Sequence, residues 1–297
     1  MRSRVVGTDA LLLGTVLLWA LNFPVTKYLL THGFEPLAYA VVRYGVGAVL
    51  FAGIAFAMDR TLAVGRSAWR YLGPAVLALL VNQVCFVFAL DLTTAATAAL
   101  VLGTTPVFTV LISHLTGIER LSGRFWLAAA VSFLGVALVV LGSGRELSGD
   151  FGGNLLALGM AVTWAAYSVA LAPLMRSYSP YRISAVVLLA MWIPLLAIGA
   201  LQTSEQDYAS LGWEVWLGLA YAIVGPLVLT NLLWFTAIGR VGPSHATIFA
   251  NLLPFAAALL AVLTLSESLS PVQVAGGILI ALGIVIVRYR APAPQAP

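Results

Sequence analysis

Long apolar runs, separated by short charged or turn-forming segments, dominate the chain, and each has the roughly 20 residues that a helix needs to cross a bilayer. Of 297 residues, 61% are hydrophobic and 9% are charged, whereas a soluble domain has about 25% charged residues. The sequence therefore predicts an all-α membrane protein with no room for a soluble catalytic domain. Its ten transmembrane helices are expected at residues 10–30, 36–58, 69–90, 94–115, 124–142, 152–174, 180–201, 213–237, 244–264 and 271–288.

The composition disfavours several function classes. The net charge of +4 comes from basic residues that are scattered between apolar runs rather than gathered in one patch, so no nucleic-acid partner is expected. Cys85 is the only cysteine of the sequence, which excludes a disulfide framework or a cysteine-based metal site within one chain, and no cofactor is expected. The first apolar run is longer than a signal-peptide core of about 7 to 15 residues, so it is interpreted as the first membrane helix.

Lysines and arginines predict which side each loop faces, because positively charged loops stay in the cytoplasm. With a cytoplasmic N-terminus, the ten-helix arrangement puts every loop arginine except Arg145 on the cytoplasmic side. Lys27 and Arg43 fall inside helices. A different number of helices would reverse the side of the later loops. The same charge bias therefore favours ten helices with both termini in the cytoplasm.

The two halves of the chain share a register of identical residues. At one constant offset, Pro106, Glu119, Leu121, Ser122 and Gly135 recur as Pro254, Glu267, Leu269, Ser270 and Gly283. Further pairs are Gly14 with Gly159, Trp19 with Trp164, Asn82 with Asn231 and Phe86 with Phe235. Since each half has an odd number of helices, the second copy must be inverted in the membrane. We predict a first repeat at residues 1–147 and an inverted second repeat at 148–297, joined in one membrane domain as in secondary transporters.

The chain also resembles the EamA-type carriers of the drug/metabolite transporter superfamily. The matching motifs are Trp19–Lys27 (WALNFPVTK), Pro36–Tyr44 (PLAYAVVRY) and the stretches Pro106–Glu119 and Pro254–Glu267. The resemblance covers nearly the whole chain and implies a basket of ten helices around a central cavity, and the export of metabolites. Within the family the chain looks most like the YddG-type aromatic amino-acid exporters. One fold serves many solutes, so the resemblance alone does not identify the substrate.

Polar and aromatic side chains gather at the depth of the bilayer midplane, where carriers with inverted repeats bind their solutes. The candidates for substrate binding are Trp19, Asn22, Asn82, Thr104, Thr105, Thr163, Trp164, Tyr167, Asn231 and Asn251. For Asn82 and Asn231, an equally supported interpretation is a hydrogen bond that holds two helices together. Trp164 and Tyr167 share a helix face that suits stacking on an aromatic or apolar solute, with ordinary packing as the alternative. Trp19 is expected to be structural.

Lys27 and Arg43 lie within the outer part of the bilayer, where an ionisable side chain is a functional candidate. Arg43 is expected either to meet a substrate carboxylate or an outer gate, or to snorkel or pair with an acid such as Glu35. For Lys27 the structural alternative is preferred. The acids fall at helix ends or in loops, whereas a carrier of bulky cations or one driven by protons is expected to keep an acid inside the membrane. The sequence therefore favours a neutral or zwitterionic substrate and does not support proton coupling.

Pro106 and Pro254 occupy equivalent mid-helix positions, and each removes a backbone hydrogen bond, so both helices should kink there. Paired interruptions point to the moving or binding region of a transporter, with a static kink as the alternative. Gly277 and Ala281 lie one helical turn apart and permit close helix contact, either within the chain or between two copies.

Together these features predict a secondary transporter of the cytoplasmic membrane that exports aromatic or other hydrophobic amino acids by alternating access. Export of other metabolites or drugs is the alternative within the same class. An intramembrane enzyme is not expected, because His32, His114 and His245 lie in loops or near helix ends and no catalytic constellation converges. A channel would differ by flux that does not saturate. The expected partners are a small solute and lipid; energy source, oligomeric state (a monomer suffices) and resting conformation are left open.

Overall fold

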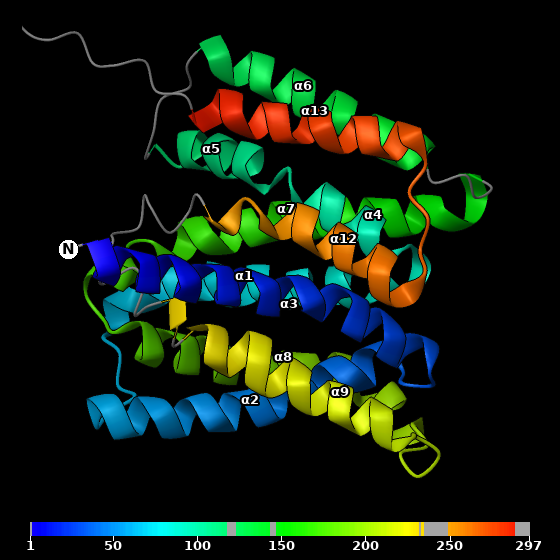
Figure 1. Ribbon diagram of the computed structural model, residues 1–297. Helices are drawn as coiled ribbons and strands as arrows, with labels where there is room; N and C mark the ends of the chain where they lie inside the picture. The colour runs from blue at the N-terminus through cyan, green and yellow to red at the C-terminus, as the bar shows by residue number, and fades with distance from the viewer. Residues whose placement is uncertain (1, 118–122, 143–146, 232, 235–248, 289–297) are drawn as a thin grey trace, which may run out of the picture.

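The computed structural model describes residues 2–117, 123–142, 147–231, 233–234 and 249–288, and within these ranges the chain is helical without β-strands (Figure 1). In the same ranges, six helices are long and apolar enough to cross a membrane. Shorter apolar helices cover Phe125–Leu141, Trp213–Leu229, Leu253–Leu265 and Pro271–Ile286. The predicted all-α membrane fold is confirmed at this level.

The helices follow the predicted apolar runs closely. They are α1 (Arg2–Thr31), α2 (Pro36–Asp59), α3 (Trp69–Leu92), α4 (Ala95–Leu102), α5 (Thr105–Leu115), α6 (Gly123–Leu141), α7 (Leu147–Leu171), α8 (Pro180–Glu205), α9 (Trp213–Ile223), α12 (Leu253–Leu265) and α13 (Pro271–Arg288). Two short 3₁₀ helices, η1 (Arg66–Ala68) and η2 (Leu174–Arg176), precede α3 and α8, and a π-helical turn, η3 (Val224–Leu229), continues α9. The first predicted span, 10–30, agrees with the candidate membrane span Thr8–Thr31, and α1 extends further toward the N-terminus, to Arg2.

Both predicted proline kinks coincide with interruptions of the helix. The predicted helix at 94–115 is divided into α4 and α5 at Gly103 and Thr104, and Pro106 lies in the first turn of α5. Pro254 likewise lies in the first turn of α12, directly after a turn at residues 251–252. Proline is tolerated in a first helical turn because the N–H that it lacks has no partner there. A Cβ atom added to Gly103 would lie 3.4 Å from Cγ of Pro254, so the two interruptions lie against each other.

The principal helix contacts join the two predicted halves of the chain. The largest packing interfaces pair α6 with α13, α3 with α7 and α2 with α8, and α12 packs on both α1 and α4. In Figure 1, α6 and α13 run side by side along one edge of the molecule and α2 lies at the opposite edge. Each pair contains one helix from residues 1–147 and one from 148–297, so neither half has its own separate core.

Two glutamines at the end of α8 bind backbone N–H groups at the start of α2. The side-chain oxygens of Gln206 and Gln202 accept hydrogen bonds from the N–H groups of Glu35 and Leu37, both at 2.7 Å. The first N–H groups of a helix have no partner within that helix. At the other end of the pair, Asp59 accepts hydrogen bonds from the hydroxyl of Ser179 and, at 3.2 Å, from Nε of Arg182. The α2–α8 pair is therefore fastened at both ends.

Glu267 shows why an acid at a helix end need not be part of a transport site. Its carboxylate accepts hydrogen bonds from the N–H groups of Ala95 and Ala96, at 2.8 and 2.9 Å. A negative charge is favourable at the positive N-terminal end of a helix, here α4. Its predicted repeat partner, Glu119, lies outside the described residues.

Glycines bring α6 and α13 into backbone contact. A Cβ atom added to Gly276 would lie 2.6 Å from the carbonyl oxygen of Gly135, and one added to Gly135 would lie 2.7 Å from the carbonyl oxygen of Gly276. Gly277 faces Leu100 of α4 at 3.3 Å by the same construction. These glycines of α13 are therefore used for contacts within the chain.

We predict that Gly276→Ala destabilises the protein by about 1–3 kcal/mol, because the new methyl group meets a backbone that cannot rotate away. Gly53→Ala is the matched control, since a Cβ atom there meets nothing within 4 Å. That control should be neutral or slightly stabilising, as alanine is the better helix former by roughly 0.5–1 kcal/mol. The thermal midpoint of the detergent-solubilised protein measures both; equal midpoints for the two variants would contradict the packing argument.

Candidate functional site

Arg43 is a charged side chain buried in the middle of an apolar bundle. It is 4% exposed, and its Nε donates a hydrogen bond to the carbonyl oxygen of Ala222 in α9 at 3.2 Å. The rings of Tyr39, Tyr44 and Phe86 surround the guanidinium, with centroids 5.8, 5.3 and 6.0 Å from Cζ. Aromatic faces attract a cation, but they do not satisfy its N–H groups.

Arg43 has no carboxylate partner among the described residues. The ion pair in that part of the chain joins Arg182 to Asp59. The considered pairing with Glu35 is not formed; Glu35 is exposed, and its backbone N–H is bound to Gln206. Within the same residues, the two terminal nitrogens of Arg43 have no hydrogen-bond acceptor. A buried charge without a counter-charge is costly, and such residues mark solute pathways in membrane proteins.

The acceptor for Arg43 is available because of Pro226. In a regular helix, the carbonyl of Ala222 would bind the N–H four residues later, but that residue is proline and has none. Pro226 itself lies in the π-turn η3, after which the N–H of Thr230 binds the carbonyl of Gly225, five residues earlier. Single π-turns are frequent at functional sites. Nε of Arg43 therefore takes the place of the missing backbone donor.

Trp19 binds a backbone carbonyl within the π-turn. Its indole Nε1 donates to the carbonyl oxygen of Pro226 at 3.2 Å, and the hydroxyl of Thr230 donates to the same oxygen at 2.7 Å. The hydroxyl of Tyr221 reaches the carbonyl of Leu18 on α1 at 2.8 Å. Trp19 thus ties α1 to the interrupted helix, and its ring also packs on Trp234 with centroids 5.3 Å apart.

Asn22, on α1, has a buried acceptor that no described residue uses. It is 7% exposed, and its Oδ1 is buried without a hydrogen-bond donor in the described part of the chain. Its neighbour Phe23 packs edge-on against Phe86, the ring that also flanks Arg43, at 5.5 Å. One turn later, Thr26 shares a hydrogen bond of 2.9 Å with the hydroxyl of Tyr39. A buried acceptor left unpaired costs about 1–3 kcal/mol, so Asn22 is suited to receive a donor from a ligand.

Trp164 is the most accessible of the predicted midplane residues. It is 41% exposed, although Met160 and Ala161, one turn earlier on the same face of α7, are buried. Its indole meets the ring of Tyr167 at 5.5 Å with a tilt of 46°. Tyr167 is partly buried and packs against the main apolar core, to which Tyr39 and Tyr44 also belong. The predicted aromatic face of α7 therefore consists of one accessible ring and one ring that packs on the core.

Asn82 and Asn231 differ although they occupy matching positions in the predicted repeat. Nδ2 of Asn82 donates to the carbonyl of Met160 at 2.8 Å and to the hydroxyl of Thr163 at 3.2 Å, so it ties α3 to α7. Nδ2 of Asn231 donates to the carbonyl of Leu227 in its own helical segment. The interhelical hydrogen bond considered for both residues is thus formed by Asn82 alone among the described contacts.

The remaining predicted residues lie near the helix interruptions. The hydroxyls of Thr104 and Thr105 donate to the carbonyls of Val101 and Leu102, at 2.8 and 2.7 Å, which stabilises the break between α4 and α5. Asn251 is half-buried in the turn before α12. These side chains lie at the interruptions that contain Pro106 and Pro254, rather than in contact with Arg43.

Lys27 contacts the end of α3. Its Nζ donates to the carbonyl oxygen of Asp91 near the end of α3, at 3.1 Å. This contact fastens α1 to α3 and fits the preferred structural role. Within the residues that the structure describes, no three His, Cys, Asp or Glu side chains come close enough together to hold a metal ion.

The sequence interpretation missed the aromatic surroundings of Arg43 and the π-turn that holds it. Tyr39, Tyr44 and Phe86 look like ordinary members of apolar runs. Pro226 was a usable signal, because it interrupts the predicted helix at 213–237 in the same way as Pro106 and Pro254 interrupt theirs.

Comparison with known proteins agrees with this architecture. The sequence pattern of the EamA-like transporter family matches residues 7–141 and again residues 151–289. The chain belongs to the EamA-like transporter family. It is thus a member of a family of multi-pass membrane transporters rather than of a family of enzymes.

Two curated relatives and one solved structure span nearly the whole EamA-family chain. It is 27% identical over 293 residues to the "Probable amino-acid metabolite efflux pump" of Escherichia coli (strain K12), covering 96% of this chain and 95% of that protein. It is 22% identical over 279 residues to the "Uncharacterized transporter YyaM" of Bacillus subtilis (strain 168), covering 92% and 91%. A solved structure described as "Crystal structure of protein" matches with a TM-score of 0.63 and 22% identity, covering 95% and 97%. The structural match establishes a shared fold.

We predict that Asn82→Leu lowers stability by about 1 kcal/mol, whereas Asn231→Leu changes it much less. The first variant removes the tie between α3 and α7 and leaves Nε2 of Gln83 without its acceptor, Oδ1 of Asn82. The second removes a bond within one helical segment. Thermal midpoints of the two purified variants provide the comparison, and a larger loss for Asn231→Leu would refute this assignment.

Proposed function

We propose that this EamA-family protein exports amino acids with aromatic or other large apolar side chains across the cytoplasmic membrane by alternating access. The observation that carries the proposal is the buried guanidinium of Arg43, ringed by aromatic side chains and without a carboxylate partner in the described part of the chain. On α1, Asn22 supplies an unused acceptor next to Phe23, whose ring packs on Phe86 of the Arg43 site. A zwitterion with an apolar side chain complements all three features.

The substrate carboxylate binds the terminal nitrogens of Arg43. A guanidinium and a carboxylate form two parallel hydrogen bonds when their planes align. Ala222 already holds Nε, so the orientation of the guanidinium is set before the substrate arrives. Removal from water strengthens the charge pairing, and the substrate supplies the counter-charge that the site lacks.

The substrate ammonium donates to Oδ1 of Asn22. This oxygen is neutral, so it accepts the ammonium without creating a second buried charge. A purely anionic solute would leave it unpaired, and a purely cationic solute would lie beside Arg43 with like charge. The pair therefore selects zwitterions over both.

The aromatic side chains of the site receive the apolar part of the substrate. Trp164 offers an accessible indole on an otherwise packed face, and Tyr167 lies against it. Offset or edge-on aromatic contacts add about 0.5–1.5 kcal/mol to the burial of a ring. The E. coli relative is described as a probable amino-acid metabolite efflux pump, which supports the proposed substrate class.

Ten helices in two inverted repeats, with both termini in the cytoplasm, provide the alternating access. The distribution of arginines, the two separate family matches and the pairing of helices between the halves support this arrangement. The interruptions before Pro106 and Pro254 meet near Gly103 and serve as the hinges. Discontinuous helices at the repeat interface are where carriers of this kind bind and move.

Counterflow in liposomes tests the function. Vesicles that hold purified protein and unlabelled phenylalanine should accumulate labelled phenylalanine saturably, and Trp164→Ala should lose the preference for phenylalanine over alanine. Arg43→Gln should lower the affinity for phenylalanine at least tenfold, because a hydrogen bond to a charged group contributes about 1.5–3 kcal/mol. Lys27→Gln is the control and should keep near wild-type affinity. No accumulation of any amino acid by the folded protein, or an equal loss in both cation variants, would refute the proposal.

Three related solutes test the role of Asn22. Phenylalanine should compete for transport far better than 3-phenylpropionate, which lacks the ammonium group, or phenethylamine, which lacks the carboxylate. Asn22→Leu should lower the affinity for phenylalanine by about tenfold, since about 1–2 kcal/mol of hydrogen bonding to the ammonium group is lost. The affinity for 3-phenylpropionate, which has no ammonium group, should stay unchanged. If the variant binds both solutes more weakly by the same factor, Asn22 has a packing role instead.

A further inference from the structure

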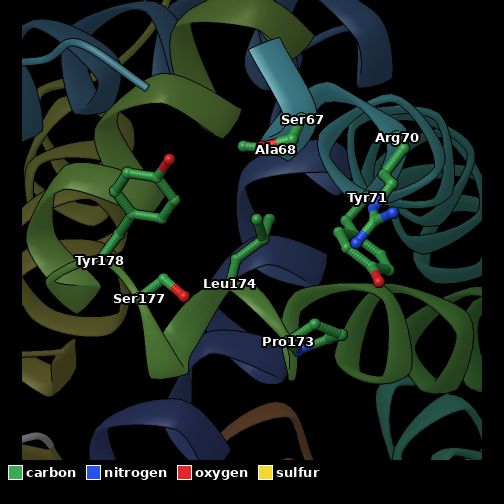
Figure 2. Close-up of a pocket in the computed structure, with 8 residues that line it drawn as sticks. All are labelled: Ser67, Ala68, Arg70, Tyr71, Pro173, Leu174, Ser177 and Tyr178. Carbon is green, nitrogen blue, oxygen red and sulfur yellow. The ribbon is translucent and has the colours of Figure 1, made fainter. Parts of the chain in front are cut away.

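A pocket lies where the start of α3 faces the connection between α7 and α8, and Arg43 is not among its lining residues. Its volume is about 290 Å³. It is lined by Ser67, Ala68, Arg70, Tyr71, Pro173, Leu174, Ser177 and Tyr178. Figure 2 shows Arg70 and Tyr71 on one side of the opening, Ser177 and Tyr178 on the other, and Leu174 between them.

The pocket has a mostly polar lining with one positive charge. Its buried apolar members are Leu174 and Ala68. The polar groups among the lining residues are the guanidinium of Arg70 and the hydroxyls of Ser67, Tyr71, Ser177 and Tyr178. None of these eight described residues is acidic. The lining therefore offers hydrogen-bond donors and a positive charge without any competing carboxylate.

Arg70 is held toward the pocket by its neighbour. Its Cζ lies 4.6 Å from the centroid of the Tyr71 ring, a stacked cation–π contact that restricts the long side chain. On the opposite wall, the hydroxyl of Tyr178 accepts a hydrogen bond from the N–H of Gly65 at 3.0 Å, which fixes that ring as well. The two sides are thus positioned independently of any ligand, and the hydroxyl proton of Tyr178 remains available to an acceptor.

We propose that this pocket binds a phosphate group. A tetrahedral oxyanion accepts several hydrogen bonds at once, and a guanidinium with surrounding hydroxyls is the lining that recognises it. The neighbouring Trp69 is exposed at the first residue of α3, as is typical of tryptophan at a membrane surface. A lipid headgroup and a free phosphorylated solute can both bring a phosphate group to the membrane surface.

Binding would fasten two parts of the chain. Arg70 belongs to the first predicted half, and Ser177 and Tyr178 belong to the second. The hydrogen bond from Gly65 to Tyr178 already crosses this junction. A phosphate bridging Arg70 to the opposite hydroxyls would add a second crossing, so it should stabilise the arrangement in which this end is closed. The inference depends on the pocket alone and stands whether or not the proposed transport substrate is correct.

Thermal unfolding of the full chain in detergent tests the site. The protein is titrated in phosphate-free buffer with inorganic phosphate and, separately, with micelles that contain phosphatidylglycerol. We expect a saturable rise in the thermal midpoint and at least a fivefold weaker response in Arg70→Gln. Ser177→Leu, which fills the pocket without changing its charge, should weaken the response similarly.

Arg66→Gln is the matched control, because Arg66 is an exposed arginine one turn away that does not line the pocket. It should respond like the wild-type protein. Stabilisation by phosphatidylglycerol alone identifies a lipid headgroup as the ligand, and stabilisation by inorganic phosphate as well identifies a soluble phosphate. No stabilisation by either, or an equal loss in Arg66→Gln and Arg70→Gln, would overturn the proposal.

Discussion

Every backbone polar group within a membrane must find its partner inside the protein, and the interruptions of this chain's helices are where that constraint is hardest to meet. Side chains from distant segments supply the missing partners. Arg43 donates to Ala222 because Pro226 cannot. Trp19 donates to the carbonyl of Pro226 within the π-turn, and Glu267 accepts from the first N–H groups of α4. The breaks in the helices therefore depend on these polar side chains, which supply the hydrogen bonds that the broken helices cannot make.

This arrangement leaves a specific imbalance at Arg43. One nitrogen of the guanidinium completes a backbone hydrogen bond, while the charge itself faces aromatic rings rather than a carboxylate in the described part of the chain. A purely structural residue could satisfy the carbonyl without carrying a charge. The use of arginine at this position is explained when the charge is completed by a solute, which is the reason to place the substrate there.

Two helix pairs at the edges of the molecule support the helices around Arg43. Backbone contact between α6 and α13 forms a stiff edge, because glycines remove the side chains that would separate the helices. The α2–α8 pair is tied at both ends by polar contacts. Between these two supports lie α1, α4, α9 and α12, which contain or contact the interruptions. The division suits a family of transporters, in which some helices must be able to move relative to others.

The sequence by itself determined the all-helical membrane character, most helix boundaries, the prolines that interrupt helices and the place of Arg43 within an apolar run. Each follows from local properties: the length of an apolar run, the missing N–H of proline and the place of a charge within a run. Only the tertiary structure decided that Asn82 bonds to another helix whereas Asn231 bonds to its own, or that Arg43 meets Ala222 rather than Glu35. A polar group's partner depends on which helices pack together and on how each helix is rotated about its own axis. Similar apolar residues cover most helix faces of this chain, so the sequence alone carries little information about either.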